Sequence, residues 1–189
     1  MKKYLFLLLL LLLPSATHAI SCFDNNSGSV ADWGGFKSVN FRGNSFTVST
    51  ACNITSATIH SNYVLTSNIA WAMTVYSDSG GSPGSVLTTS ASSSVTSTAD
   101  PTWSDNTVTF DGTYTLQTAT TYWMVAKNFD GTGGNLNWAC KTGSDGKYFD
   151  GTNWNLQGCS FMFSVAGDAP APPSTPTSII GLVRSFFIF

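Results

Sequence analysis

The stretch that decides the fold is IAWAMTVYSDSGGSPG, residues 69–84. In its first half, large apolar side chains alternate with smaller or more polar ones, so the period is two residues rather than 3.6. Period two is typical of a β-strand with one face against a core and the other toward solvent or a second layer. The second half contains the small residues that tight turns need, so the stretch predicts one arm of a β-hairpin.

The same alternation recurs on both sides of this stretch. Further short alternating or apolar runs lie at residues 46–50, 56–60, 107–110, 114–117, 121–126, 136–141, 147–149 and 161–165. Asp-Gly turn signals at 111–112, 130–131 and 150–151 separate several of them. About eight to ten short strands without an amphipathic helix predict an all-β fold, an antiparallel β-sandwich of jelly-roll type in one domain.

The serine- and threonine-rich segment 82–98 breaks this pattern. Its alternation is weak, so we expect an edge strand that starts at Val86 and Leu87 and a solvated loop over the remainder.

The composition excludes several classes of partner. The chain has 189 residues, only 10% of them charged, and a formal net charge of −2, and all ten acidic residues are aspartates. A basic footprint for nucleic acid or for a membrane surface is therefore absent from the sequence, and we expect no nucleic-acid partner. The 42% hydrophobic and 13% aromatic content indicates a folded chain rather than a disordered one.

The two ends of the sequence differ from its middle. Two lysines, nine consecutive apolar residues, Pro14 and a small-residue segment ending at Ala19 predict a signal peptide over 1–19, and hence a secreted or cell-surface protein. A lipoprotein with a lipidated Cys22 is the weaker alternative. We expect the sandwich over 20–167, a proline-rich linker over 168–177 and a short apolar tail over 178–189, too short to span a bilayer.

Four cysteines in an exported chain predict two disulfides. Three pairings are open, and we favour Cys22–Cys52 with Cys140–Cys159 because each closes a local loop. A zinc site is the alternative, but the chain has no CxxC pair and a single histidine after the expected cleavage point, so we expect no metal there.

Four segments together resemble a known family: residues 74–87, 110–125, 148–154 and 161–167. They are similar to the bacterial choice-of-anchor domains, in particular the type labelled R, over about residues 40–167. The resemblance implies an exported β-sandwich followed by one of several C-terminal anchoring devices, and it implies no catalytic residues. The end of this chain departs from such devices, because Pro-Glu-Pro, LPxTG and a basic terminus are absent and Arg184 interrupts the apolar tail. Two interpretations of the tail follow: a degenerate or truncated anchor, or only an apolar terminus without an anchoring role.

Catalytic motifs are weak in this sequence, and we expect no enzymatic activity. Residues 80–84 match G-x-S-x-G, but Pro83 follows the serine and cannot supply the N–H of an oxyanion hole. His60 is the only histidine after the expected cleavage point, and alternation with Ile59 turns it toward solvent. A hydrolase would require His60 to lie within hydrogen-bond reach of both an aspartate and a serine.

Aspartate-rich loops leave calcium as a structural ion, although we expect no cofactor. Residues 130–135 and 145–150 offer oxygen ligands, but turn formation explains the same residues. Residues 150–154 are similar to half of an Asp-box, which predicts a rigid hairpin.

Tryptophans next to turns are the remaining signal. Trp71 and Trp123 lie inside strands and are expected in the core, whereas Trp103, Trp138, Tyr148 and Trp154 lie next to turns rich in Asn, Asp and Gly. Two hypotheses follow. The first is a non-enzymatic surface domain with a structural or adhesive role, whose partner is a cell-surface protein or is unknown. The second is a module that binds extracellular glycan through Trp138, Tyr148 and Trp154 on one exposed face.

Overall fold

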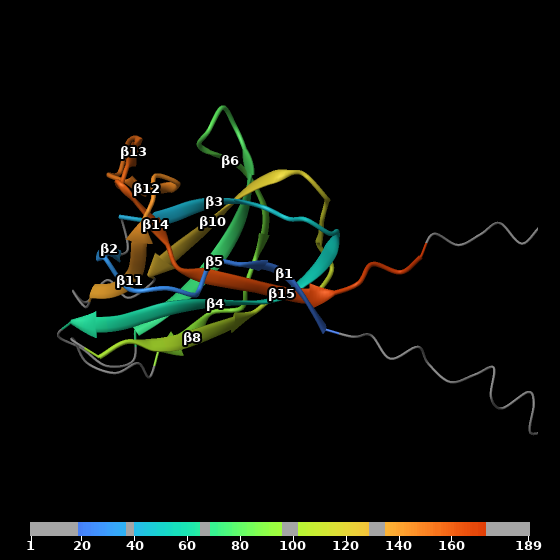
Figure 1. Ribbon diagram of the computed structural model, residues 1–189, viewed down its shortest axis with the longest axis horizontal. Helices are drawn as coiled ribbons and strands as arrows, with labels where there is room; N and C mark the ends of the chain where they lie inside the picture. Colours follow the sequence, from blue (N-terminus) through green and yellow to red (C-terminus); the bar gives the residue numbers. More distant parts are fainter. Residues whose placement is uncertain (1–18, 37–39, 65–68, 96–101, 129–134, 173–189) are drawn as a thin grey trace, which may run out of the picture.

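The computed structural model describes residues 19–36, 40–64, 69–95, 102–128 and 135–172. Within these ranges the chain forms β-strands and no helix, and all strand pairs are antiparallel (Figure 1). The strands make two sheets that share one hydrophobic core. The all-β sandwich predicted from the period-two alternation is therefore confirmed.

The first sheet follows the order β1-β15-β4-β11-β14, with β2 paired to β11 and with β8 and β9 paired to β4. Its strands are β1 (Ala19–Asp24), β2 (Asp32–Phe36), β4 (Cys52–Val64), β8 (Ser104–Thr109), β9 (Thr115–Leu116), β11 (Asn135–Thr142), β14 (Cys159–Phe161) and β15 (Phe163–Asp168).

The second sheet follows the order β13-β12-β3-β10-β5-β6, with β7 paired to β5. Its strands are β3 (Arg42–Thr47), β5 (Ile69–Asp78), β6 (Pro83–Thr89), β7 (Ser93–Val95), β10 (Thr121–Asn128), β12 (Gly146–Phe149) and β13 (Trp154–Leu156).

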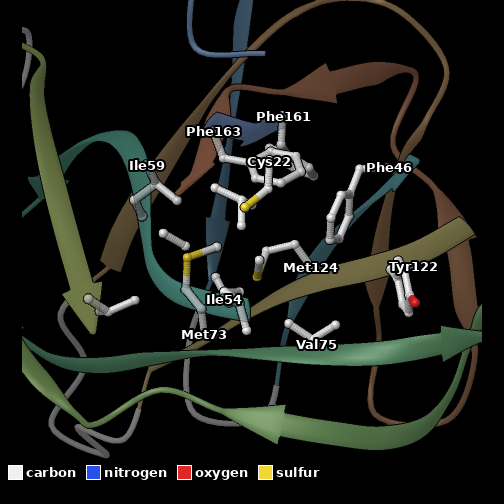
Figure 2. Close-up of a cluster of buried hydrophobic side chains, with 14 of the residues drawn as sticks. Cys22, Phe46, Ile54, Ile59, Met73, Val75, Tyr122, Met124, Phe161 and Phe163 are labelled. Carbon is white, nitrogen blue, oxygen red and sulfur yellow. The ribbon is translucent and has the colours of Figure 1, made fainter. Parts of the chain in front are cut away.

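The core lies between the inner faces of the two sheets (Figure 2). On β5 the alternation holds as predicted, because Trp71, Met73 and Val75 are fully buried in this cluster. Ile59 of β4 and Met124 of β10 face the same cluster from opposite sheets. Burial of such side chains contributes about 1.5–3 kcal/mol each, so this interface is the main source of stability.

Both predicted disulfides are present. Cys22–Cys52 joins β1 to β4, and Cys140–Cys159 joins β11 to β14. Each bridge fastens a strand at the margin of the first sheet to a longer strand.

Two predicted segments differ from the structure. After residue 82 the chain enters β6 at Pro83 rather than at Val86, and a further strand, β7, lies where a loop was predicted. Ser90, between these two strands, is held against β5 because its Oγ accepts a hydrogen bond from Met73 N at 3.0 Å. Further along the chain, the run 161–165 is split into β14 and β15. Met162 lies at the break, where its N–H donates to Ala139 O and its carbonyl accepts from His60 N.

The described chain begins in β1 at Ala19, which pairs with Asp168 at the end of β15. Residues 1–18 and 173–189 lie outside the described residues, so the expected signal peptide up to residue 18, half of the linker and the apolar tail do too. Among the described residues no helix is long and apolar enough to cross a membrane.

Candidate functional site

The second sheet curls until its two margins meet. Lys147 on β12 donates a hydrogen bond from Nζ to Ser82 Oγ at 2.8 Å, although β3, β10 and β5 lie between β12 and β6 in the sheet order. This contact closes the outer face of the sheet into a hollow, which we call the concave face. Figure 1 shows the β12–β13 hairpin and the tip of the β5–β6 hairpin rising on the same side of β3 and β10.

The floor of the concave face is built by β10 and β5. Trp123 is only 3% exposed, yet it alternates with the core residues Tyr122 and Met124 and so faces outward. Its Nε1 donates to Asp78 Oδ1 at 2.7 Å, and the Lys147 ammonium lies 5.5 Å above its ring. The outer side of this sheet is thus a second packed layer.

The β5–β6 turn forms one wall. Asp78 also accepts from Gly81 N through Oδ2 at 3.3 Å, and Ser79 N donates to Ser82 O at 2.8 Å. Gly80 and Gly81 both have positive φ, at 61° and 80°, which explains the Gly-Gly pair in this turn. The G-x-S-x-G match is therefore a surface turn followed by a strand, as the sequence predicts.

The β12–β13 hairpin forms the opposite wall. Asp150 Oδ1 accepts hydrogen bonds from the amides of Thr152 and Asn153, and Oδ2 accepts from Asn155 Nδ2. The amide of Asn153, then that of Thr152 and then the side chain of Asn155 lower the pKa of the Asp150 carboxyl. Trp154 at the base of this turn packs against Phe149, with ring centroids 5.4 Å apart.

Two cavities occupy the concave face, one on each side of the Lys147–Ser82 contact. The larger has a volume of about 400 Å³ and is lined by Ser45, Asp78, Gly81, Thr121, Trp123, Ser144, Asp145, Lys147 and Leu156. The smaller has a volume of about 160 Å³ and is lined by Phe41, Tyr76, Pro83, Gly84, Phe149 and Trp154. The first is polar with an aromatic floor, and the second is largely aromatic.

A third cavity, the end cleft, opens at the margin of the sandwich. It has a volume of about 570 Å³ and is lined by Phe23, Asn25, Asn44, Ser45, Phe46, Thr47, Lys141, Thr142, Gly143, Asp145 and Ser160. Two residues, Ser45 and Asp145, line both the end cleft and the larger cavity of the concave face.

The three predicted glycan-binding residues do not share one exposed face. Trp138 is fully buried, stacks on Phe161 with centroids 4.7 Å apart and donates from Nε1 to Met162 O at 2.6 Å. Its predicted role is wrong, because β11 turns this side chain into the core. Tyr148 and Trp154 are half-buried; Trp154 lines the smaller cavity, whereas Tyr148 lies beside Arg42, whose guanidinium is 5.1 Å from the ring centroid.

His60 lies on the outer face of the first sheet. Ile59 is buried and the His60 side chain is 27% exposed, as predicted, and its Nδ1 lies 2.9 Å from Asp105 Oδ1. Trp103 stacks on the imidazole at 5.9 Å. Among the described residues no serine is hydrogen-bonded to the His60 ring, so the hydrolase condition is met only for the aspartate.

The expected calcium ligands are only partly described. The segment 130–135 lies outside the described residues except for Asn135. In the segment 145–150, Asp145 accepts from Ser160 Oγ, and Asp150 stabilises its own turn. The described part of the chain has no group of three His, Cys, Asp or Glu side chains that could hold a metal.

Sequence reasoning missed the residues at the centre of the concave face. The sequence predicts Trp123 in the main core and Asp78 in a turn. In the structure Trp123 lies on the outer face of its sheet, and its hydrogen bond to Asp78 joins β10 to that turn. The signal lies in two of the four family-like segments, since residues 77–84 of the first carry the turn and residues 120–123 of the second carry the tryptophan. A period of two does not distinguish an outer face covered by further chain from one exposed to solvent, so it does not predict that these two segments meet.

Comparison with known proteins identifies the fold. No family model matches the chain, and no curated protein matches it. It is similar to the clostridial cysteine protease Cwp84 after propeptide cleavage, with a TM-score of 0.57 and 11% identity over 83% of this chain and 41% of that chain. It is also similar to a structure of the cysteine protease and lectin-like domains of Cwp84, a surface layer associated protein of Clostridium difficile. There the TM-score is 0.51 and the identity 12%, over 76% of this chain and 37% of that chain. The chain thus spans less than half the length of these structures, and the likeness shows a shared fold.

Proposed function

We propose that this protein is an exported, non-enzymatic domain that adheres to extracellular carbohydrate through its concave face. The observation that carries the proposal is the pair of cavities on that face, which combine aromatic surface with hydroxyl, carboxylate and ammonium groups. Sugar rings present apolar C–H faces and hydroxyl groups together, and ligand sites typically combine apolar walls with a few fixed polar groups. The larger cavity lies within the usual size range of small-molecule sites.

Two further features support export and display. Two disulfides persist in oxidising surroundings and are rare in the cytosol, and the first nineteen residues have the pattern of a signal peptide. A surface-layer protein with a lectin-like domain shares the fold, which is compatible with a surface role.

A binding role is favoured over catalysis by the state of the nucleophile candidates. All four cysteines of the chain are in disulfides, so no thiol remains for cysteine-protease chemistry. Ser82 of the G-x-S-x-G match accepts a hydrogen bond from Lys147 Nζ and directly precedes β6 of the second sheet, whereas His60 lies on β4 of the first sheet.

The test is a polysaccharide and glycan screen on the full chain, exported into an oxidising compartment, with and without EDTA. The wild type should bind at least one class of polysaccharide. Trp154→Ala should weaken that binding about tenfold or more, since truncating an anchoring aromatic side chain costs about 2 kcal/mol or more at a binding hot spot.

Trp103→Ala is the matched control, because Trp103 is also half-buried but lies on the outer face of the first sheet. It should bind as the wild type does, and thermal unfolding of both variants should show a folded chain. Loss of binding in EDTA would indicate that the site also needs a calcium ion. A wild type that binds no sugar, or a Trp154→Ala variant that binds as well as the wild type, would overturn the proposal.

A further inference from the structure

Asp145 lies where the concave face and the end cleft meet. The residue is exposed and lines both cavities, and the loop that carries it is held against β3 by the hydrogen bond from Ser45 N to Asp145 O at 3.3 Å. Its Oδ2 accepts from Ser160 Oγ at 3.1 Å. Among the described residues its Oδ1 has no hydrogen-bond partner, so one carboxylate oxygen is available at the junction.

The end cleft has the same mixed chemistry as the concave face. Phe23 and Phe46 form an apolar wall, with ring centroids 5.3 Å apart. The side-chain amides of Asn25 and Asn44 bind main-chain groups of Phe161: Asn25 donates to its carbonyl at 3.0 Å, and Asn44 accepts from its N–H at 2.9 Å. These bonds fix both amides in place. Asn44 is buried and its Nδ2 donates to Ser45 O at 2.8 Å, so the half-buried Asn25 is the ordered amide that the cleft presents beside its aromatic wall.

The charges along this path are balanced. Lys141 and Lys147 line it together with Asp78 and Asp145, and none of the four makes an ion pair within 4.0 Å among the described residues. The two carboxylates would repel an acidic polymer, and the two ammonium groups would repel a basic polymer. Balanced, separated charges of both signs instead suit hydroxyl groups, which both donate and accept hydrogen bonds.

From this geometry we infer that the ligand is a neutral polysaccharide chain that passes Asp145, with some of its sugar units on the concave face and the following units in the end cleft. The inference rests on the proposed function and extends it to the class and length of the ligand. The two cavities of about 400 Å³ and 570 Å³ are each within the range of a complete small-molecule site, so together they exceed what one sugar unit needs.

The experiment measures affinity against chain length. The probes are oligomers of about one to six hexose units, prepared from the neutral polysaccharide that binds best in the screen, with oligogalacturonate as the acidic comparison. The wild-type affinity should rise with length up to about three units or more and should be higher for the neutral series.

Two variants test the path. Asp145→Ala removes the carboxylate at the junction, and Thr142→Trp fills the end cleft from an exposed lining position. Both should weaken binding of the longer oligomers about tenfold and change that of the monomer and dimer little, whereas Trp154→Ala should weaken all lengths. Thr107→Trp, an exposed threonine on β8 of the other sheet, is the control and should have no effect.

The outcomes separate the two proposals. If no sugar binds the wild type, the proposed function fails and this inference fails with it. If sugars bind but affinity does not change beyond one or two units, if Thr142→Trp binds long oligomers as the wild type does, or if the acidic series binds better, the proposed function stands and the neutral chain across Asp145 is overturned.

Discussion

The indole N–H of Trp123 and the carboxylate of Asp78 are joined by a 2.7 Å hydrogen bond across the outer face of the second sheet. Trp123 lies on β10 and Asp78 ends β5, so the bond ties the central strand to the turn that walls the concave face. Residues 77–84 and 120–123, which belong to two of the family-like segments, are therefore joined by one contact. The shape of the candidate site depends on this contact.

Removing the acceptor should destabilise the protein. Asp78→Ala leaves a buried indole N–H without its partner, and such an orphaned group costs about 1–3 kcal/mol. Asp78→Asn retains a side-chain oxygen and should recover most of the loss. Urea unfolding of both variants measures this, with Asp105→Asn on the first sheet as the control, since an exposed pair contributes about 0–1 kcal/mol. Equal stabilities for Asp78→Ala and the wild type would contradict the role assigned to this bond.

The β12–β13 hairpin should weaken in acid. Hydrogen bonds from Asn153, Thr152 and Asn155 lower the pKa of Asp150 in the fold, so its ionised form is favoured there over the unfolded chain. This contribution is fully present above the unfolded value of about 3.9 and is lost as the pH falls through the lower folded pKa.

Asp150→Asn removes the titration while retaining one acceptor oxygen. The difference in melting temperature between wild type and variant should be present at about pH 7 and should shrink as the pH falls below about 4. A difference that stays constant down to about pH 2 would show that charge on Asp150 does not contribute. The amide shifts of Thr152 and Asn153 provide a local measurement of the same titration.

Truncation of Trp138 should act mainly on stability, and truncation of Trp154 mainly on sugar binding. Trp138→Ala removes a fully buried ring stacked on Phe161 and should cost about 3–5 kcal/mol of stability. Trp154 is half-buried in the hairpin wall, so Trp154→Ala should cost clearly less and act mainly on sugar binding. Thermal unfolding compared with binding separates the two effects. A large stability loss for Trp154→Ala would instead place this residue among the structural ones.

The contrast between these tryptophans shows how far local sequence patterns reach. Period two placed Trp71, Met73 and Val75 in the core, because a strand in a sandwich has one face that must be buried. Trp138 was misassigned because its neighbours in sequence are turn-forming residues, whereas its burial follows from pairing with β4 and β2, which are distant in the sequence. Proximity to a turn does not determine which face of a strand a side chain occupies.

The curl of the second sheet could not be foreseen for a similar reason. It depends on Lys147 reaching Ser82, two residues 65 positions apart that neither period nor composition connects. Val125 and Thr74 are buried on the outer face under the curled margins, and in sequence they look like ordinary alternation. The disulfides were predictable because local loop closure favoured one pairing, but the cavities arise from which strands meet.

Arg42 should be dispensable for stability. Burial lowers the pKa of its guanidinium, its Nε has no hydrogen-bond acceptor, and no carboxylate lies within 4.0 Å among the described residues. A partly desolvated cation without a carboxylate partner is costly. The Phe41 carbonyl, which accepts from Arg42 Nη1 at 3.4 Å, and the Tyr148 ring at 5.1 Å offset only part of that cost. Arg42→Met keeps a similar volume without the charge, so it should leave the free energy of unfolding unchanged or raise it by about 1 kcal/mol.

Lys127→Met is the comparison, since the Lys127 ammonium lies 4.5 Å from the Phe41 ring and its loss should cost about 0.5–1 kcal/mol. If Arg42→Met were less stable than Lys127→Met in urea, contact with Tyr148 would have to outweigh the burial of the charge.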